Sequence, residues 1–366
     1  MQKDFHYYAT YCAAVLAGYS PEDSVSIAYS AQFVDCCSAT YLKKIKAPEE
    51  AATTQSQLEL ADIKPGILTM QNMTRIWASF HFLPGDLYAG RKVSFKPYMD
   101  KYRLLCNTNG DLILKTVKLA KYIGSLQASG IAMHVLADTW AHAHFAGTPS
   151  FVINNTNNYF YEIISGSGDK TLEEKIRFKH DPRITDDLDS HIYVNSAYNP
   201  AENSVLNLGH ARAGHLPDYS FVCYKYLPAW GDYAVITKDN PSDYYHAFCQ
   251  MVYAMRFLRG EPDNFETDRY DTESIAPYKD DIMKILRKRQ LDASEDWSSF
   301  AQKLTGQSIE DFDAEKYSDE YIEADAKEDT FLGHFIEAAT MHKVMVTNEI
   351  RKSGNMLAGK PRLAAK

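Results

Sequence analysis

The chain has 366 residues, 45% of them hydrophobic and 24% charged, which excludes a disordered or fibrous protein and leaves room for a large buried core. It carries 39 basic and 48 acidic residues, and this net charge of −9 argues against chain-wide attraction to nucleic acid or anionic lipid. No apolar stretch approaches the roughly 20 residues that a membrane span needs. Because the N-terminal segment has no apolar leader pattern, we expect a cytoplasmic protein without a transmembrane segment.

The first forty residues are predicted to be helical, whereas residues 51–64 are polar and predict a loop or an exposed helix. Ser20 and Pro21, followed by two acidic residues, are typical of a helix start, and we expect that helix to continue to about Tyr41. The clearest helix is predicted from about Gly110 to Phe145, with glycines at 124 and 130 as the points where it can break.

The character of the chain changes after residue 150. Residues 150–209 are rich in Asn and Gly and contain short β-branched or aromatic runs, so we expect a loop-rich insertion that carries short strands. Residues 261–330 hold 21 acidic and 9 basic residues and are expected to form a solvated, peripheral element. The sequence thus predicts an all-α fold with a helical domain over 1–260, and with the acidic segment and C-terminal helix of 261–366 packed on the same domain.

The most informative motif is His134-x-x-x-Asp138-x-x-x-His142, because residues four apart lie on one face of a helix. The helical rise between the two histidines is about 12 Å, too long for both to bind one ion, whereas Asp138 is about 6 Å from each. Such a carboxylate suits a bridge between two metal ions. A solvent-facing polar stripe is the alternative, but the flanking residues are apolar on most sides, which predicts burial.

Several other histidines and carboxylates are candidate ligands. Some lie near the N-terminus, some in strongly apolar surroundings, and some in a glycine-containing segment that suits a ligand-bearing loop. His144 leaves the helical row but can turn toward it where the helix ends. The full set of further candidates is Asp4, His6, Asp35, His81, His144, His210, His215 and Asp218.

The order of these histidines and aspartates along the chain resembles that of the zinc-dependent phospholipases C and the single-strand-specific zinc nucleases. Members of that family are mostly helical and hold three zinc ions. The family signature is His-x-x-x-Asp on a central helix with another His four or six residues later. His6, Asp35 and the pair His81-Phe82 match the family's earlier positions. The match covers roughly residues 1–220, and the chain also resembles an uncharacterised bacterial branch with the motifs D-F-H-Y-Y and A-D-T-W-A-H.

The resemblance implies a ligand set for two or three Zn²⁺ ions, although Mn²⁺ or iron would suit such donors nearly as well. Secreted members of the family bind one metal ion through the amine and carbonyl of an N-terminal Trp. In this chain either Asp4 would replace those two groups or that metal ion would be missing. The implied first ion is held by Asp35, His81, His134 and Asp138, with Asp138 shared; the second by His6; and the third by His142 or His144, His210 or His215, and Asp218.

The expected function is metal-dependent hydrolysis of phosphate esters, either phospholipase C-like or phosphodiesterase- and nuclease-like. A small phosphate ester or phospholipid is the expected substrate, and the net charge disfavours nucleic acid without excluding it. Bound ions would polarise phosphate oxygens and lower the pKa of water. Asp35 or Asp4 would be the general base, Asp138 the bridge, and Arg212 either a phosphate clamp or a structural residue. The alternative is a non-catalytic helical binding protein that metals stabilise.

Overall fold

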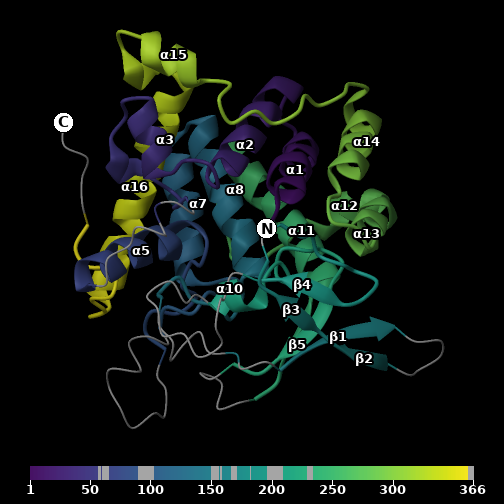
Figure 1. Ribbon diagram of the computed structural model, residues 1–366. Helices are drawn as coiled ribbons and strands as arrows, with labels where there is room; N and C mark the ends of the chain where they lie inside the picture. The colour runs from purple at the N-terminus through teal and green to yellow at the C-terminus, as the bar shows by residue number, and fades with distance from the viewer. Residues whose placement is uncertain are drawn as a thin grey trace.

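The computed structural model describes residues 1–56, 59, 66–89, 103–149, 156, 159–165, 171–181, 183–195, 209–228 and 234–361. Helices dominate these ranges and the strands are short, so the prediction of a mostly helical fold with short strands in the insertion is confirmed (Figure 1). Parts of the 150–209 insertion, 196–208 among them, lie outside the described residues. No helix among the described residues is both long and apolar enough to cross a membrane.

The elements follow one another along the chain with few long interruptions. The helices are η1 (Asp4–Ala9, a π-helix), α1 (Thr10–Leu16), α2 (Pro21–Phe33), α3 (Ala39–Lys44), α5 (Ile67–Phe80), α7 (Asp111–Ile123), α8 (Leu126–Ala141), α10 (Gly209–Ala213), α11 (Asn240–Arg259), α12 (Thr272–Ile275), α13 (Lys279–Arg287), α14 (Ser294–Thr305), α15 (Ser318–Glu323) and α16 (Phe331–Lys352). Short 3-10 turns cover Glu49–Ala51, Ala276–Tyr278 and Lys327–Asp329. The strands are β1 (Phe160–Ser165), β2 (Thr171–Lys175), β3 (Arg177–Lys179), β4 (Ile192–Val194), β5 (Cys223–Tyr226) and β6 (Ile236–Asp239).

Helix α8 is the centre of the molecule. Every residue from Gln127 to Ala141 is buried, as a segment that is apolar on most sides requires. α8 packs against α2, α7, α11 and α16, and Figure 1 shows it surrounded by helices that come from both ends of the chain. The predicted motif residues therefore lie in the interior and not on a solvent-facing stripe.

Two predicted helices are shorter than the sequence predicted, and the longer one breaks at one of the two glycines named as break points. The 110–145 helix divides at Gly124, whose φ of 75° is left-handed, and Ser125 caps the next helix by accepting a hydrogen bond from the Ala128 N–H. The helix expected to reach Tyr41 ends at Phe33. Asp35 therefore lies in a turn after α2, where its side chain can approach α8.

The strands form a smaller layer below the C-terminal end of α8 (Figure 1). One antiparallel sheet has the order β2-β1-β5-β6, and β3 pairs with β4 in parallel. Aromatic residues of the sheet, such as Phe160 and Tyr226, form a second core with Phe82 and Phe145, which belong to the helical part. This second core joins the insertion to the end of α8.

The acidic region 261–330 is not simply peripheral, contrary to the expectation from its charge. Its helices α13 and α14 place Ile282, Leu286 and Trp297 in the main core, and their charged residues face solvent. The physical reason is amphipathicity, because a helix with a net charge still buries one apolar face.

Gly130 allows α8 and α2 to approach closely. A Cβ atom at this position would lie 2.3 Å from the Ile27 carbonyl oxygen. We therefore expect Gly130→Ala to lower the free energy of unfolding by about 2 kcal/mol, as overpacked cores do. Urea denaturation measures this, with Gly66→Ala as the control because only one atom lies near its added methyl group, at 4.0 Å. Equal stability of the two variants would contradict this packing.

Lys343 on α16 is buried, and its Nζ donates a hydrogen bond to the Ala52 carbonyl oxygen at 2.6 Å. Burial lowers its pKa from 10.5 to about 7. Between these values the unfolded chain holds a proton that the folded chain lacks, so this residue makes the free energy of unfolding rise with pH. Between pH 7 and 9, we expect the urea concentration at the unfolding midpoint to rise less for Lys343→Met than for the wild type. If the unfolding midpoints of the two proteins changed equally with pH, the lowered pKa of Lys343 would be contradicted.

Candidate metal centre

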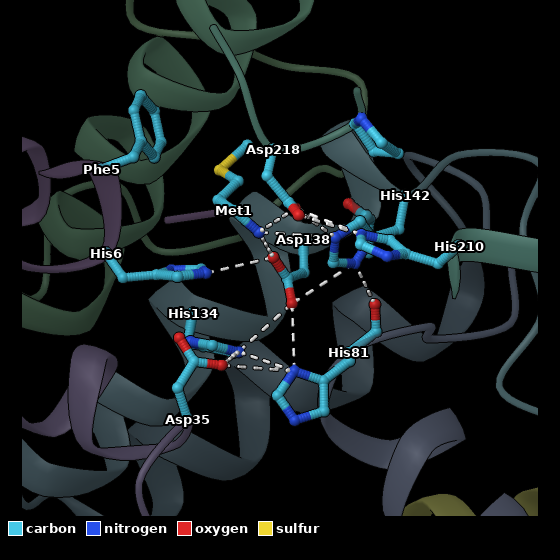
Figure 2. Close-up of polar contacts among 12 residues, drawn as sticks. Met1, Phe5, His6, Asp35, His81, His134, Asp138, His142, His210 and Asp218 are labelled. Carbon is cyan, nitrogen blue, oxygen red and sulfur yellow. Dashed lines mark hydrogen bonds and ion pairs between the residues drawn. The ribbon is translucent and has the colours of Figure 1, made fainter. Parts of the chain in front are cut away.

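Histidines and carboxylates from separate parts of the chain converge at the C-terminal half of α8 (Figure 2). They come from η1, from the ends of α2, α5 and α8, from α8 itself, and from α10 and the turn after it. The converging residues are His6, Asp35, His81, His134, Asp138, His142, His210 and Asp218.

Asp138 lies at the middle of this cluster and is only 1% exposed. Its Oδ1 atom is 3.2 Å from Nε2 of His6. Its Oδ2 atom faces the other way and is 3.2 Å from Nε2 of His134 and 3.3 Å from Nδ1 of His81. One carboxylate thus presents its two oxygens to two different sets of imidazoles, which is the arrangement a bridging ligand requires.

A further set of donors surrounds Asp218. The Nε2 atoms of His142 and His210 each lie 3.2 Å from its carboxylate oxygens. His134 and His142 therefore belong to different sets, as their spacing along the helix predicted. Three sets of donor atoms have all members within 4.8 Å of one another: His6, His134 and Asp138; Asp35, His81 and His134; and His142, His210 and Asp218.

Backbone carbonyls fix the tautomers of two histidines. Nε2 of His81 is 3.0 Å from the Thr53 carbonyl oxygen, and Nδ1 of His142 is 2.7 Å from the carbonyl oxygen of His81. Because a carbonyl oxygen only accepts, each of these nitrogens carries the proton. The other ring nitrogens therefore direct their lone pairs at the cluster, as in histidines that bind metals.

Several buried atoms of the cluster have no hydrogen-bond partner. They are both ring nitrogens of His6, Nδ1 of His134 and Oδ2 of Asp138. Buried polar atoms without partners are costly. Nε2 of His6 lies 3.2 Å from Oδ1 of Asp138 without hydrogen-bond geometry, as is expected of two donors that point at a common cation. Imidazole nitrogens with carboxylate oxygens are the donor set of zinc, so the residues present fit this metal.

The charge state of the cluster also suits a cation. Burial alone raises the pKa of Asp138, but His142, the N-terminal ammonium group and the two other histidines outweigh it and hold the pKa well below its usual range. Burial, together with His134, lowers the pKa of His6 to about 4. At neutral pH the centre therefore combines ionised carboxylates with a neutral His6, as metal ligation requires.

Residues 1–350 match a family of unknown function, DUF6765. The chain belongs to this family. No curated protein and no solved structure matches the chain. The resemblance to the zinc phospholipases C and zinc nucleases therefore rests on the residues that carry it.

The DUF6765 chain has one group in the cluster that sequence reasoning missed. The ammonium group of Met1 lies 2.9 Å from Oδ1 of Asp138 and 3.2 Å from Oδ1 of Asp218. Burial lowers the pKa of this amine, but Asp138 and Asp218 outweigh that effect and raise it to about 11. No pattern of side chains can indicate a backbone amine. The resemblance to the zinc phospholipases C pointed to an N-terminal amine as a ligand, but Asp4 was expected to take its place.

Asp4 is directed elsewhere, which corrects that expectation. Its Oδ2 atom accepts a hydrogen bond from the Ala293 N–H at 3.0 Å, and burial raises its pKa to about 6. This carboxylate serves the start of α14, because an orphan N–H at a helix start needs an acceptor. It takes no part in the three donor sets.

The remaining candidates also lie outside the three donor sets. His215 is paired with Asp186 through Nδ1, at 2.9 Å. Arg212 is buried on α10, and His144 follows the end of α8 with a φ of 78°. Between the alternatives that the sequence left open, the geometry favours His142 over His144 as the ligand, and His210 over His215.

This choice can be tested with two matched substitutions. We expect His142→Ala to lower the number of zinc ions bound per chain and His144→Ala to leave it unchanged, because only His142 lies within a donor set. Elemental mass spectrometry of the dialysed proteins measures the difference. A loss confined to His144→Ala would reverse the assignment.

Proposed function

We propose that this DUF6765 protein is a metal-dependent hydrolase of phosphate esters with a two- or three-zinc centre. The observation that carries the proposal is the buried Asp138, whose two oxygens face separate groups of histidines. Metal centres that hydrolyse phosphate esters use such bridging carboxylates to hold two ions close together. Small phosphodiesters and phospholipids are the proposed substrates. The net charge of −9 disfavours nucleic acid and, among lipids, anionic surfaces.

The donor sets indicate which residues would hold each ion. Asp138 would be shared, and the N-terminal ammonium lies between Asp138 and Asp218, the region that a cation would occupy. The proposed ligands are Asp35, His81, His134 and Oδ2 of Asp138 for one ion; His6 and Oδ1 of Asp138 for another; and His142, His210 and Asp218 for a third.

When bound, the ions would supply Lewis acidity toward phosphate oxygens and a lowered pKa for water. Asp35 is the best placed general base. Its side chain is 32% exposed, against 11% for Asp218 and 1% for Asp138, so it is the carboxylate of the cluster most open to water. One of its oxygens faces His81, at 3.7 Å, and the other accepts a 3.4 Å hydrogen bond from Nε2 of Gln32.

A second candidate is a metal-stabilised protein without catalytic activity. The near-complete burial of His6, His134 and Asp138 favours it, because structural ions are fully enclosed by ligands. The partial exposure of Asp35 and His210 favours the hydrolase, because a catalytic ion needs a side that water and substrate can reach. Arg212 is buried, so its position gives no support to a role as phosphate clamp.

The decisive experiment measures zinc content and hydrolysis of bis(p-nitrophenyl) phosphate together. We expect wild type to bind two or three zinc ions and Asp138→Ala to lose more than one, because the two oxygens of Asp138 are proposed ligands of two different ions. Turnover should fall by about 100-fold or more, since even indirect supports of metal sites cost up to that factor. Asp281→Ala is the control, because this carboxylate is exposed and contacts Lys303 on the surface.

The outcomes separate the two candidate functions. Zinc bound by wild type without turnover of any phosphate ester, combined with unfolding on chelation, would favour the metal-stabilised binding protein. Less than one equivalent of zinc in wild type, unchanged in Asp138→Ala and not restored by added metal, would overturn both.

A further inference from the structure

We infer that Arg289 and Glu162 form a brace that sets the metal affinity of the His142, His210 and Asp218 group. Arg289 follows α13 in the acidic C-terminal region, and Glu162 lies on β1. The inference rests on the proposed metal centre. It gives this region a role that its charge did not suggest.

The brace begins at Glu162, which is 2% exposed. Its Oε2 atom accepts hydrogen bonds from Nδ1 of His191 at 2.7 Å, from the Tyr193 hydroxyl at 3.0 Å and from Nη2 of Arg289 at 3.3 Å. Arg289 also donates through Nη1 to Oε1 of Glu162 and through Nη2 to the Leu188 carbonyl oxygen. The ion pair between Arg289 and the buried Glu162 thus fastens residues 186–195, here called the bracing segment, to the sheet.

The bracing segment in turn holds residues 209–219, here called the ligand turn. Oδ2 of Asp186 accepts hydrogen bonds from Nδ1 of His215 at 2.9 Å and from the Tyr219 hydroxyl at 2.6 Å. These two partners lie on either side of Asp218 in the sequence. Nδ2 of Asn195 donates to the Arg212 carbonyl oxygen at 3.2 Å. Three side-chain hydrogen bonds therefore fix the segment that carries His210 and Asp218.

The two backbones also meet at Gly214, whose φ of 59° is left-handed. A Cβ atom there would lie 2.3 Å from the Val194 carbonyl oxygen. Only glycine allows this approach. The ligand turn is consequently pressed against β4 and has little freedom to move toward it.

The opposite side of the ligand turn is held by α11. Nδ2 of Asn240 donates to the carbonyl oxygens of Leu216 and Tyr219, both at 2.8 Å. Loss of the brace would leave this second support in place, so the turn would loosen and the fold would persist. Supports one step behind metal ligands contribute about 10- to 100-fold to metal affinity.

The effect should be confined to one group of ligands. The other donors, His6, Asp35, His81 and His134, belong to η1, α2, α5 and α8 or to their ends. Within the described part of the chain, no hydrogen bond or ion pair joins any of them to the bracing segment. A general loss of stability would instead weaken all three groups. Selectivity is therefore the readout that separates a positioning role from a merely structural one.

The test titrates metal-free protein with Zn²⁺ against a chromophoric chelator. His210→Ala identifies the binding step of this group. We expect Arg289→Ala and Glu162→Gln to weaken that step about 10-fold and to leave the others unchanged. Arg256→Ala is the matched control, because Arg256 is 36% exposed, against 35% for Arg289. Arg256 forms an ion pair with Asp271, with 2.6 Å between the charged atoms, and neither residue belongs to the ligand turn. Arg289→Lys should recover part of the loss.

Hydrogen exchange of the metal-free proteins distinguishes failure of the brace from failure of the metal centre. We expect amides of the ligand turn to exchange faster in Arg289→Ala than in Arg256→Ala. Unchanged zinc binding, or equal weakening of every step, would overturn the inference. If wild type binds no zinc, the proposed function fails and the metal affinity inferred here fails with it, whereas faster exchange would still establish the brace.

Discussion

The structure depends on one constraint, the burial of an ionised carboxylate inside an apolar helix. Asp138 is 1% exposed in α8, and a carboxylate taken out of water must be surrounded by positive or hydrogen-donating groups. The chain meets this requirement by bringing the ends of α2, α5 and α8, the first residues and the ligand turn to the same place. The cluster is therefore a charged and polar site within an apolar core, and the need to surround Asp138 accounts for the convergence of distant segments there.

The supports of the cluster extend well beyond its ligands. α16 anchors the segment before Thr53 through Lys343, and the Thr53 carbonyl oxygen in turn fixes the tautomer of His81. On the other side, the sheet and the acidic region act through Glu162 and Arg289 on the ligand turn. The C-terminal third, which contributes none of the donors in the three sets, thus contributes to their orientation.

Burial differs between the interior and the edges of the cluster, and this difference bears on the two proposed functions. His6 and His134 are enclosed on all sides, and their rings stack with centroids 3.8 Å apart. Asp35 and His210 lie at the edges and retain contact with solvent. A closed interior suits a structural ion and an open edge suits a catalytic one, so both proposed functions fit the same arrangement of residues.

Regular periodicity determined what the sequence could establish alone. The row His134, Asp138 and His142, the burial of its helix and the separation of its two histidines follow from 3.6 residues per turn and from the apolar flanks. Only the tertiary structure favours His142 over His144 and His210 over His215 as candidate ligands. It also directs Asp4 to α14 and places the Met1 amine beside Asp138. Those outcomes depend on turns and chain ends whose positions are set by contacts between residues far apart in the sequence. Local spacing carries no information about such contacts.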